Sequence, residues 1–421
     1  MNRTFNTEGY CDPEFNYMVD LSERLKAIKE MVDSEKYFTI NKARQYGKTT
    51  VLTALAEYLQ MEYEVISLDF QTMSSLAFES EQAFVTAFSE ELLDNALLPE
   101  KMKEKLLACI EKKSGSVSLS ALFRVLKAWC KSTEKKIVLM IDEVDTATNN
   151  QVFLDFLAQL RAAYLNRRKV PTFQSVILAG VYDVRNIKKK IRLEEEHKTN
   201  SPWNIAADFL VDMSFSVTDI NGMLKEYEAD YHTGMDIEKM AALLYGCTSG
   251  YPYLVSRLCK LLDEFVAGSE EFSDKTSAWT LEGLMMAEKR LLNENNPLFQ
   301  SLTGKLADYP QLRTILYQLL FTGKAIPYVS QNSCIDIAAM FGFIKNDNGC
   351  VAISNRIFES VLYNLFISEE FITSKLYDTG LMEKNQFIVG GHLDVRQTLF
   401  SVVFKTNYQW CGQYLCGAGD P

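Results

Sequence analysis

The sequence predicts an α/β fold in which a parallel, doubly wound sheet is followed by an all-α helical lid and a winged-helix-like unit. Three observations lead to this prediction. Short apolar runs alternate with helical patterns between residues 37 and 215, as expected when helices connect parallel strands. The run 37–41 leads into a loop that ends Gly47-Lys48-Thr49, and the run 136–141 ends at Asp142-Glu143.

The loop after the first run is typical of a phosphate-binding loop. Backbone N–H groups of such a loop and of the following helix surround nucleotide phosphates, while Lys48 reaches the β and γ phosphates and the Thr49 hydroxyl ligates Mg²⁺. We expect Gly47 and Thr50 to contribute to the same site. In the general pattern a glycine would stand at position 42, where this chain has Lys42.

Arg44 lies inside the loop and has two interpretations. It supplements Lys48 at the phosphates, or it faces solvent or pairs with the segment after Glu143.

The second motif is the acidic pair after Ile137-Val-Leu-Met-Ile141, a run that suits a strand buried on both faces. In this Walker B pattern Asp142 holds Mg²⁺, and Glu143 orients and deprotonates the attacking water. The alternative is a solvated strand end. Because both motifs follow apolar strands and occur in order, we favour the nucleotide site.

The remaining elements follow from periodicity. The extra carboxylate after Asp142 suggests an additional strand between the loop strand and the Walker B strand in space. The five predicted strands are 37–41, 64–70, 136–141, 174–180 and 208–215.

Residues after 215 show helical periodicity with glycine and proline boundaries. Helices are predicted at 218–231, 236–245, 253–265 and 277–293, and 293–297 reads as a linker. Further helices at 311–321, 331–341 and 354–366, with a hairpin between the last two, indicate a winged-helix-like unit. The predicted domains are 1–215 (P-loop ATPase), 216–295 (helical lid), 296–370 (winged-helix-like) and 371–421 (a C-terminal extension).

Composition limits the classes of function. The chain has 421 residues, 47% of them hydrophobic, and a formal net charge of −11, which argues against a surface devoted to nucleic acid. Nine scattered cysteines and three distant histidines indicate reduced thiols and no zinc site. No run is long enough to span a membrane and the start lacks a secretion signal, so we expect a cytoplasmic protein.

With these motifs placed, the chain resembles the bacterial AAA-ATPase-like family, whose members often carry a C-terminal PD-(D/E)xK-type nuclease domain. The resemblance runs from about Tyr10 to about Leu399, and it implies ATP and Mg²⁺ as cofactors. That family typically has a basic residue where Lys42 stands. Because Asp420 is the sole carboxylate after Leu399, we expect the nuclease domain to be absent or truncated.

The segment Gly250-Tyr-Pro252 is similar to the G-x-P motif in the helical lid of signal-transducing ATPases with numerous domains. This resemblance implies that Pro252 packs against the adenine and that Arg257 reaches a phosphate. Related ATPases also place a polar sensor of the γ-phosphate after the fourth strand, where Asp183 stands; the alternative is a turn-forming residue. Gly-x-Pro also starts helices in general, because proline is favoured at the first helical position.

Three functions remain open. The first is a Mg-ATP-binding ATPase that acts as a nucleotide-dependent switch on a protein partner or effector, with Lys48 and Glu143 as catalytic residues. The second is a nucleotide-binding scaffold that does not hydrolyse ATP. The third is a DNA-binding initiator that uses the winged helix; the acidic charge and the lack of Lys or Arg in 331–341 count against it.

Overall fold

The computed structural model describes residues 3–95, 98–111, 118–148, 150–181, 203–373, 388–389 and 392–393. The chain forms two compact units, residues 1–361 and 362–421. In the second unit, the described residues are the later part of a helix and two short strands, β7 (Ile388–Val389) and β8 (His392–Leu393), which pair antiparallel. The first unit contains the main parallel sheet.

Four parallel strands make up the main sheet of the described residues. They are β1 (Phe38–Asn41), β2 (Glu64–Asp69), β3 (Ile137–Asp142) and β4 (Ser175–Gly180), in the spatial order β1-β4-β3-β2. The first four predicted strands are confirmed. So is the prediction of an additional strand between the loop strand and the Walker B strand, because β4 occupies that place.

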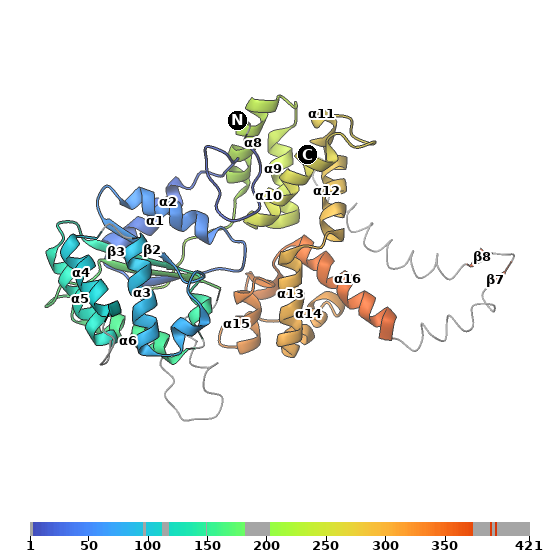
Figure 1. The fold of residues 1–421 in the computed structure, drawn as a ribbon. Helices are drawn as coiled ribbons and strands as arrows, with labels where there is room; N and C mark the ends of the chain where they lie inside the picture. The colour runs from blue at the N-terminus through green and yellow to red at the C-terminus, as the bar shows by residue number, and fades with distance from the viewer. Residues whose placement is uncertain are drawn as a thin grey trace. The chain divides into compact units, whose positions relative to one another are not determined.

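Helices cover both faces of this sheet (Figure 1). Successive side chains of a strand point to opposite faces, and β3 shows this division: Leu139 belongs to one buried cluster and Met140 to the other. One face packs against α1 (Ser22–Asp33) and α2 (Lys48–Leu59). The helices of the other face are α3 (Glu81–Asn95), α4 (Glu100–Glu111), α5 (Leu119–Ser132) and α6 (Gln151–Leu165), with the short turns η1 (Ser75–Phe78) and η2 (Val144–Ala147).

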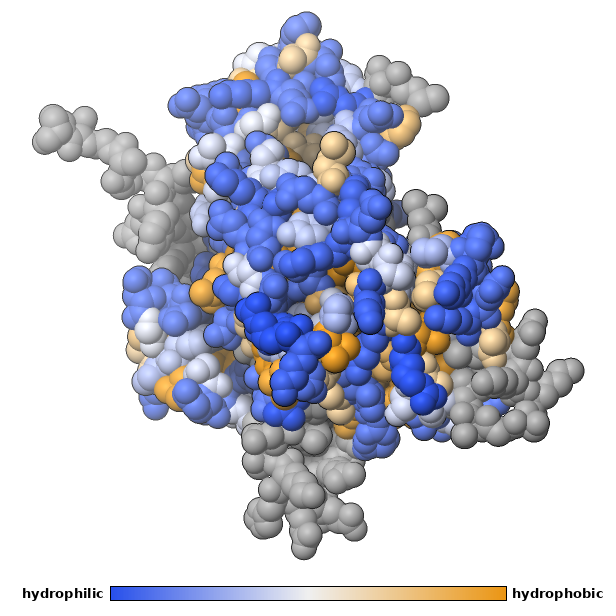
Figure 2. All heavy atoms as spheres, turned by 90° about the vertical axis from the view of Figure 1, so that its left-hand side faces the viewer, coloured by the Kyte–Doolittle hydropathy of each residue, from blue (hydrophilic) through white to orange (hydrophobic). Residues whose placement is uncertain are grey.

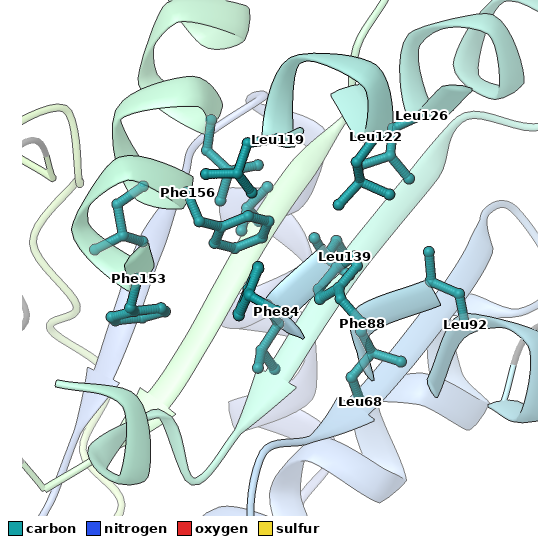
Figure 3. Close-up of a cluster of buried hydrophobic side chains, with 14 of the residues drawn as sticks. Leu68, Phe84, Phe88, Leu92, Leu119, Leu122, Leu126, Leu139, Phe153 and Phe156 are labelled. Carbon is teal, nitrogen blue, oxygen red and sulfur yellow. The ribbon is translucent and has the colours of Figure 1, made fainter. Parts of the chain in front are cut away.

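Aromatic side chains dominate the second cluster. Figure 3 shows Phe84, Phe88, Phe153 and Phe156 pointing toward one another above the strands. Phe156 of α6 is fully buried, and its ring centroid lies 5.2 Å from those of both Phe84 and Phe88. Such tilted contacts add to the free energy gained from burying the rings.

The fifth predicted strand, 208–215, is wrong. The structure has one bridge just before this segment, between Phe38 and Ala207, and residues 208–215 form no regular strand. The apolar alternation is real, since Phe209 packs on Phe38 while Leu210 is 89% exposed. The segment is instead held by Arg24, which donates to the carbonyls of Asp212 and Ser214.

Between residues 216 and 293 the structure is helical, as the sequence predicts. The helices are α8 (Val217–Tyr231), α9 (Ile237–Thr248), α10 (Pro252–Leu261) with η4 (Leu262–Val266), α11 (Lys275–Ala278) and α12 (Leu281–Asn293). A capping box at Ser216 begins α8, in which the Ser216 hydroxyl accepts from the N–H of Asp219 and the Asp219 carboxylate accepts from that of Ser216.

A third group of elements comes next, consisting of α13 (Pro297–Asp308), α14 (Pro310–Phe321), α15 (Ser333–Met340), the hairpin strands β5 (Ile344–Asp347) and β6 (Cys350–Ile353), and α16 (Arg356–Thr373). The hairpin and the helices around it are where the sequence predicts them. Helix α13 is not predicted, although Asn296 caps it and Pro297 opens it.

Charged and polar side chains cover most of the face seen in Figure 2, with smaller hydrophobic areas between them. Among the described residues, no helix combines the length and the apolar character that crossing a membrane requires.

Phe156→Ala tests the aromatic core. Because Phe156 is fully buried among other rings, we expect the substitution to lower the free energy of unfolding by about 3–5 kcal/mol. Denaturant titration followed by circular dichroism measures this. Leu165→Ala, on the same helix but 59% exposed, is the matched control and should stay within about 0.5 kcal/mol of the wild type. Equal effects of the two substitutions would contradict this description of the core.

Candidate nucleotide-binding site

The site residues lie where strands β1, β4 and β3 end. The strands are parallel and adjacent, so their carboxyl ends meet at one edge of the sheet, the edge at which open α/β sheets bind ligands. Asn41, the last residue of β1, is level with Gly180, the last of β4. The N–H of Lys42 donates to the Gly180 carbonyl over 3.2 Å, so the loop begins at a fixed place.

The loop that joins β1 to α2 turns around the ammonium group of Lys48. Nζ of this buried lysine donates to the carbonyls of Lys42 and Ala43, each over 3.1 Å. An ammonium group has three donors, so one remains for an anion. Burial lowers the pKa of Lys48, opposed by the carboxylates of Glu143, Asp145 and Asp142. A bound anion would restore the balance in favour of the charged form.

Two residues of the loop have a left-handed backbone. Gln45 has φ 55° and Gly47, which precedes the first residue of α2, has φ 76°. Left-handed residues in such a loop can turn backbone N–H groups toward one concave side, as in an anion-binding nest. The positive end of the α2 dipole adds to the same side.

Thr49 and Thr50, the next residues of α2, have different surroundings. The Thr49 hydroxyl donates to Oδ2 of Asp142 over 2.7 Å and so links the loop to β3. Thr50 is buried, and its hydroxyl accepts from the N–H of Cys11 over 3.3 Å. Thr50 therefore fastens the N-terminal segment to α2, beside the loop.

The acidic pair sits at the end of the central strand. Oδ1 of Asp142 accepts from the N–H of Glu143 over 2.9 Å. Burial raises the pKa of Asp142 and, with neighbouring carboxylates, that of Glu143; Lys48 opposes both shifts. Glu143 has φ 50°, an unfavourable conformation for a residue with a Cβ. Backbone strain of this kind is concentrated at functional sites.

Sequence reasoning missed two carboxylates of this site. Asp69 ends β2 level with Asp142, and its charge contributes to the raised pKa of both Asp142 and Glu143. Asp145 accepts from the N–H of Val181 over 2.6 Å, which fixes the turn after β3 against the end of β4. A Cβ at Gly180 would lie 2.8 Å from Oδ1 of Asp145. The sequence signal that could have identified them is the presence of carboxylates at or shortly after the ends of predicted strands.

The donor set fits magnesium rather than a protein-enclosed metal. Among the described residues, no three His, Cys, Asp or Glu side chains are grouped so that they could hold a metal ion by themselves. Mg²⁺ in nucleotide sites is usually held by one or two protein oxygens together with phosphate oxygens and waters. The Thr49 hydroxyl and the Asp142 carboxylate, 2.7 Å apart, are such a pair.

The other predicted residues are more dispersed. Arg44 is exposed at the outside of the loop, and its charge adds to the lowered pKa of Lys48. Pro252 is buried at the first position of α10. Arg257 is paired with Glu294, with a shortest distance of 2.7 Å. Asp183 lies outside the described residues.

A cavity of about 560 Å³ adjoins the first half of the loop. Asn41, Lys42, Ala43 and Tyr46 line it from the loop side, whereas Lys48 and the acidic pair do not take part in its lining.

Together, the parallel sheet with a phosphate loop after β1, an acidic pair after β3 and β4 between the two strands define a P-loop NTPase of the additional-strand type. The chain belongs to the family described as the AAA-like domain, whose model matches residues 16–277. This confirms the resemblance to AAA-type ATPases over that range. No curated protein matches the chain.

The chain is also similar to solved structures at low sequence identity. The Walker-type ATPase paby2304 of Pyrococcus abyssi is 15% identical, with a TM-score of 0.55, and the similarity covers 85% of this chain and 99% of that one. Cdc6p from Pyrobaculum aerophilum is 11% identical, with a TM-score of 0.41 and coverages of 87% and 97%. The RuvB Holliday junction branch migration motor of Thermotoga maritima is 11% identical, with a TM-score of 0.38, and the similarity covers 85% of this chain and 98% of that one.

Asp142→Asn tests the electrostatics of the site. Burial holds the pKa of Asp142 above the ordinary value of about 3.9, so the folded protein binds this proton more tightly than the unfolded chain does. Ionisation then lowers stability as the pH rises through that window. Without nucleotide or divalent cations, the amide should raise the unfolding midpoint at neutral pH, with a gain that shrinks toward about pH 4.

Thermal unfolding between these pH values measures the gain. Asp94→Asn, at an exposed position of α3, is the control and should show no such trend. A loss of stability in Asp142→Asn that does not vary with pH would contradict the assigned cause.

Proposed function

We propose that the protein binds Mg-ATP at the loop between β1 and α2, hydrolyses it to ADP and phosphate, and acts as a nucleotide-dependent switch. The observation that carries the proposal is the hydrogen bond between Thr49 and Asp142. It brings the phosphate loop and the acidic strand end within the reach of one nucleotide.

Binding rests on Lys48 and on the loop backbone. Lys48 is anchored by two loop carbonyls, and its remaining donor serves a phosphate oxygen. The N–H groups at the start of α2 and in the nest around Gln45 supply further donors. Thr49 and Asp142 would hold Mg²⁺, whose charge, when bound, neutralises the β and γ phosphates.

For hydrolysis, we assign Glu143 as the residue that orients the attacking water and accepts its proton. The supporting observations are its position directly after β3 and its raised pKa. A carboxylate with a raised pKa is a better proton acceptor near neutral pH. The remaining catalysis is positioning and electrostatic stabilisation by Lys48 and the loop.

Residues 216–295 are the proposed lid, and 296–370 the proposed winged-helix-like unit. We assign Arg44 and Asp183 to the phosphates and Pro252 to the adenine. Arg257 reaches a phosphate only if it leaves Glu294, so this assignment requires an exchange of ion-pair partners. A lid with two ion-pair states suits a switch, because ATP and ADP then favour different states. The output is contact with a protein partner.

Lys48→Ala should weaken ATP binding at least about tenfold, because phosphate oxygens lose a charge-assisted hydrogen bond. Isothermal titration calorimetry with Mg-ATP measures the dissociation constant. Lys36→Ala, at an exposed position just before β1 and so at the opposite edge of the sheet, is the matched control. Unchanged affinity in Lys48→Ala would refute the phosphate site.

Glu143→Gln should keep ATP affinity and lose turnover by at least about a hundredfold, since the amide keeps the shape but cannot accept a proton. Phosphate release under saturating Mg-ATP is the measurement, and Glu134→Gln, at an exposed position before β3, is the control. Turnover by Glu143→Gln at the wild-type rate would remove Glu143 from catalysis. No turnover in the wild type itself would favour the scaffold function.

A further inference from the structure

The proposed lid contacts the phosphate loop through Tyr251. Tyr251, in the turn between α9 and α10, donates its phenol hydrogen to the carbonyl of Arg44. We propose that Tyr251 is a positioning residue that holds the loop in its anion-binding shape and thereby couples the lid to nucleotide affinity. The inference rests on the proposed nucleotide binding.

The geometry of one peptide group carries this inference. In a trans peptide the C=O of one residue and the N–H of the next point in opposite directions. With the Arg44 carbonyl directed at Tyr251, the N–H of Gln45 is directed away from the lid turn. Gln45 itself is left-handed, a conformation that a residue with a Cβ keeps only when its surroundings impose it. The bond from Tyr251 to the preceding carbonyl is such a constraint.

Tyr251 is well suited to impose a fixed position. It is 3% exposed, and its ring centroid lies 4.7 Å from that of Tyr46 and 5.3 Å from that of Phe358, both in edge contacts. Burial raises the pKa of its phenol. The group therefore stays protonated and donates at any ordinary pH.

The backbone next to Tyr251 is equally constrained. Gly250 has φ 72°, and a Cβ at this position would lie 2.0 Å from the carbonyl oxygen of Phe215. The N–H of Phe215 donates to the Gly250 carbonyl over 2.8 Å. Phe215 lies just before α8, so the turn is fastened to the chain that leads from the sheet into the helices. A movement of these helices must then displace the Tyr251 hydroxyl from Arg44 or carry the loop with it.

A second contact supports the same loop. Gly342, between α15 and β5, approaches Ala43 so closely that an added Cβ would lie 2.9 Å from the Cβ of Ala43 and 3.9 Å from the Tyr251 ring. The loop is therefore braced at Ala43 and at Arg44 by residues about two to three hundred positions away in the sequence. Of these two contacts, the one from Tyr251 is a hydrogen bond and therefore directional.

Tyr251→Phe removes only the hydroxyl and keeps both ring contacts. We expect ATP and ADP to bind about three- to tenfold more weakly, as for the loss of one buried hydrogen bond, with a near-wild-type circular dichroism spectrum. Calorimetry with each nucleotide gives the affinities. Tyr245→Phe, on the exposed side of α9, is the control and should bind as the wild type does. Unchanged affinity in Tyr251→Phe would overturn the inference.

Gln45→Gly distinguishes positioning from general stabilisation. Glycine adopts the left-handed conformation without help, so in a Gln45→Gly background the further change Tyr251→Phe should alter affinity by less than about twofold. An equal loss of affinity in both backgrounds would show that the hydroxyl acts in some other way. The comparison remains decisive even when Tyr251→Phe lowers the unfolding midpoint. Lys48→Ala keeps the two proposals apart: if it abolishes binding while Tyr251→Phe does not weaken it, the ATP site stands and the role of Tyr251 falls.

Discussion

The hydrogen bond from Thr49 to Asp142 joins two parts of the chain that lie more than ninety residues apart, and the parallel sheet makes this contact possible. Parallel strands end at a common edge, so the loop after β1 and the carboxylate after β3 meet there although β4 lies between their strands. The β1–β4 and β3–β4 registers then set the level of each end. A slip of one residue in either pairing would turn the strand's side chains to the other face and separate Thr49 from Asp142.

Burial of the charged groups of the site lowers the free energy of unfolding, and the rest of the domain must offset this loss. Burial lowers the pKa of Lys48 and raises that of Asp142, so in each residue burial disfavours the charged form. The two aromatic and aliphatic clusters on either side of the sheet provide the opposing free energy. A phosphate with its cation would compensate these charges, and its binding would therefore stabilise the folded domain as well as occupy the site.

The sequence predicted the elements whose signal is local and missed the features that depend on distant partners. Buried strands such as Ile137–Asp142 and amphipathic helices such as α10 are encoded in short patterns, and the residues of both nucleotide motifs follow directly from them. The segment 208–215 has the pattern of a strand, but after the bridge at Ala207 it forms no ladder with β1 and is held by Arg24, a distant residue that donates to the carbonyls of Asp212 and Ser214. Asp69 joins the acidic pair only through the register of β2 with β3, which no pattern within β2 specifies.

Tyr251 shows the same limit in a functional setting. The Gly-x-Pro motif predicts a role for Pro252, because the glycine and the proline define the pattern. The residue between them, Tyr251, makes the contact with the loop. This contact has a consequence for regulation. Coupling between two sites is reciprocal in free energy, so if the lid turn holds the loop in shape, nucleotide binding must favour the same position of the turn. A partner that engages the helices after residue 216 and displaces the turn would then release nucleotide, and the same partner would bind less tightly while nucleotide is present. In the proposed switch, the hydrogen bond from Tyr251 to Arg44 would thus link the loop to the lid turn, beside the exchange of ion-pair partners at Arg257.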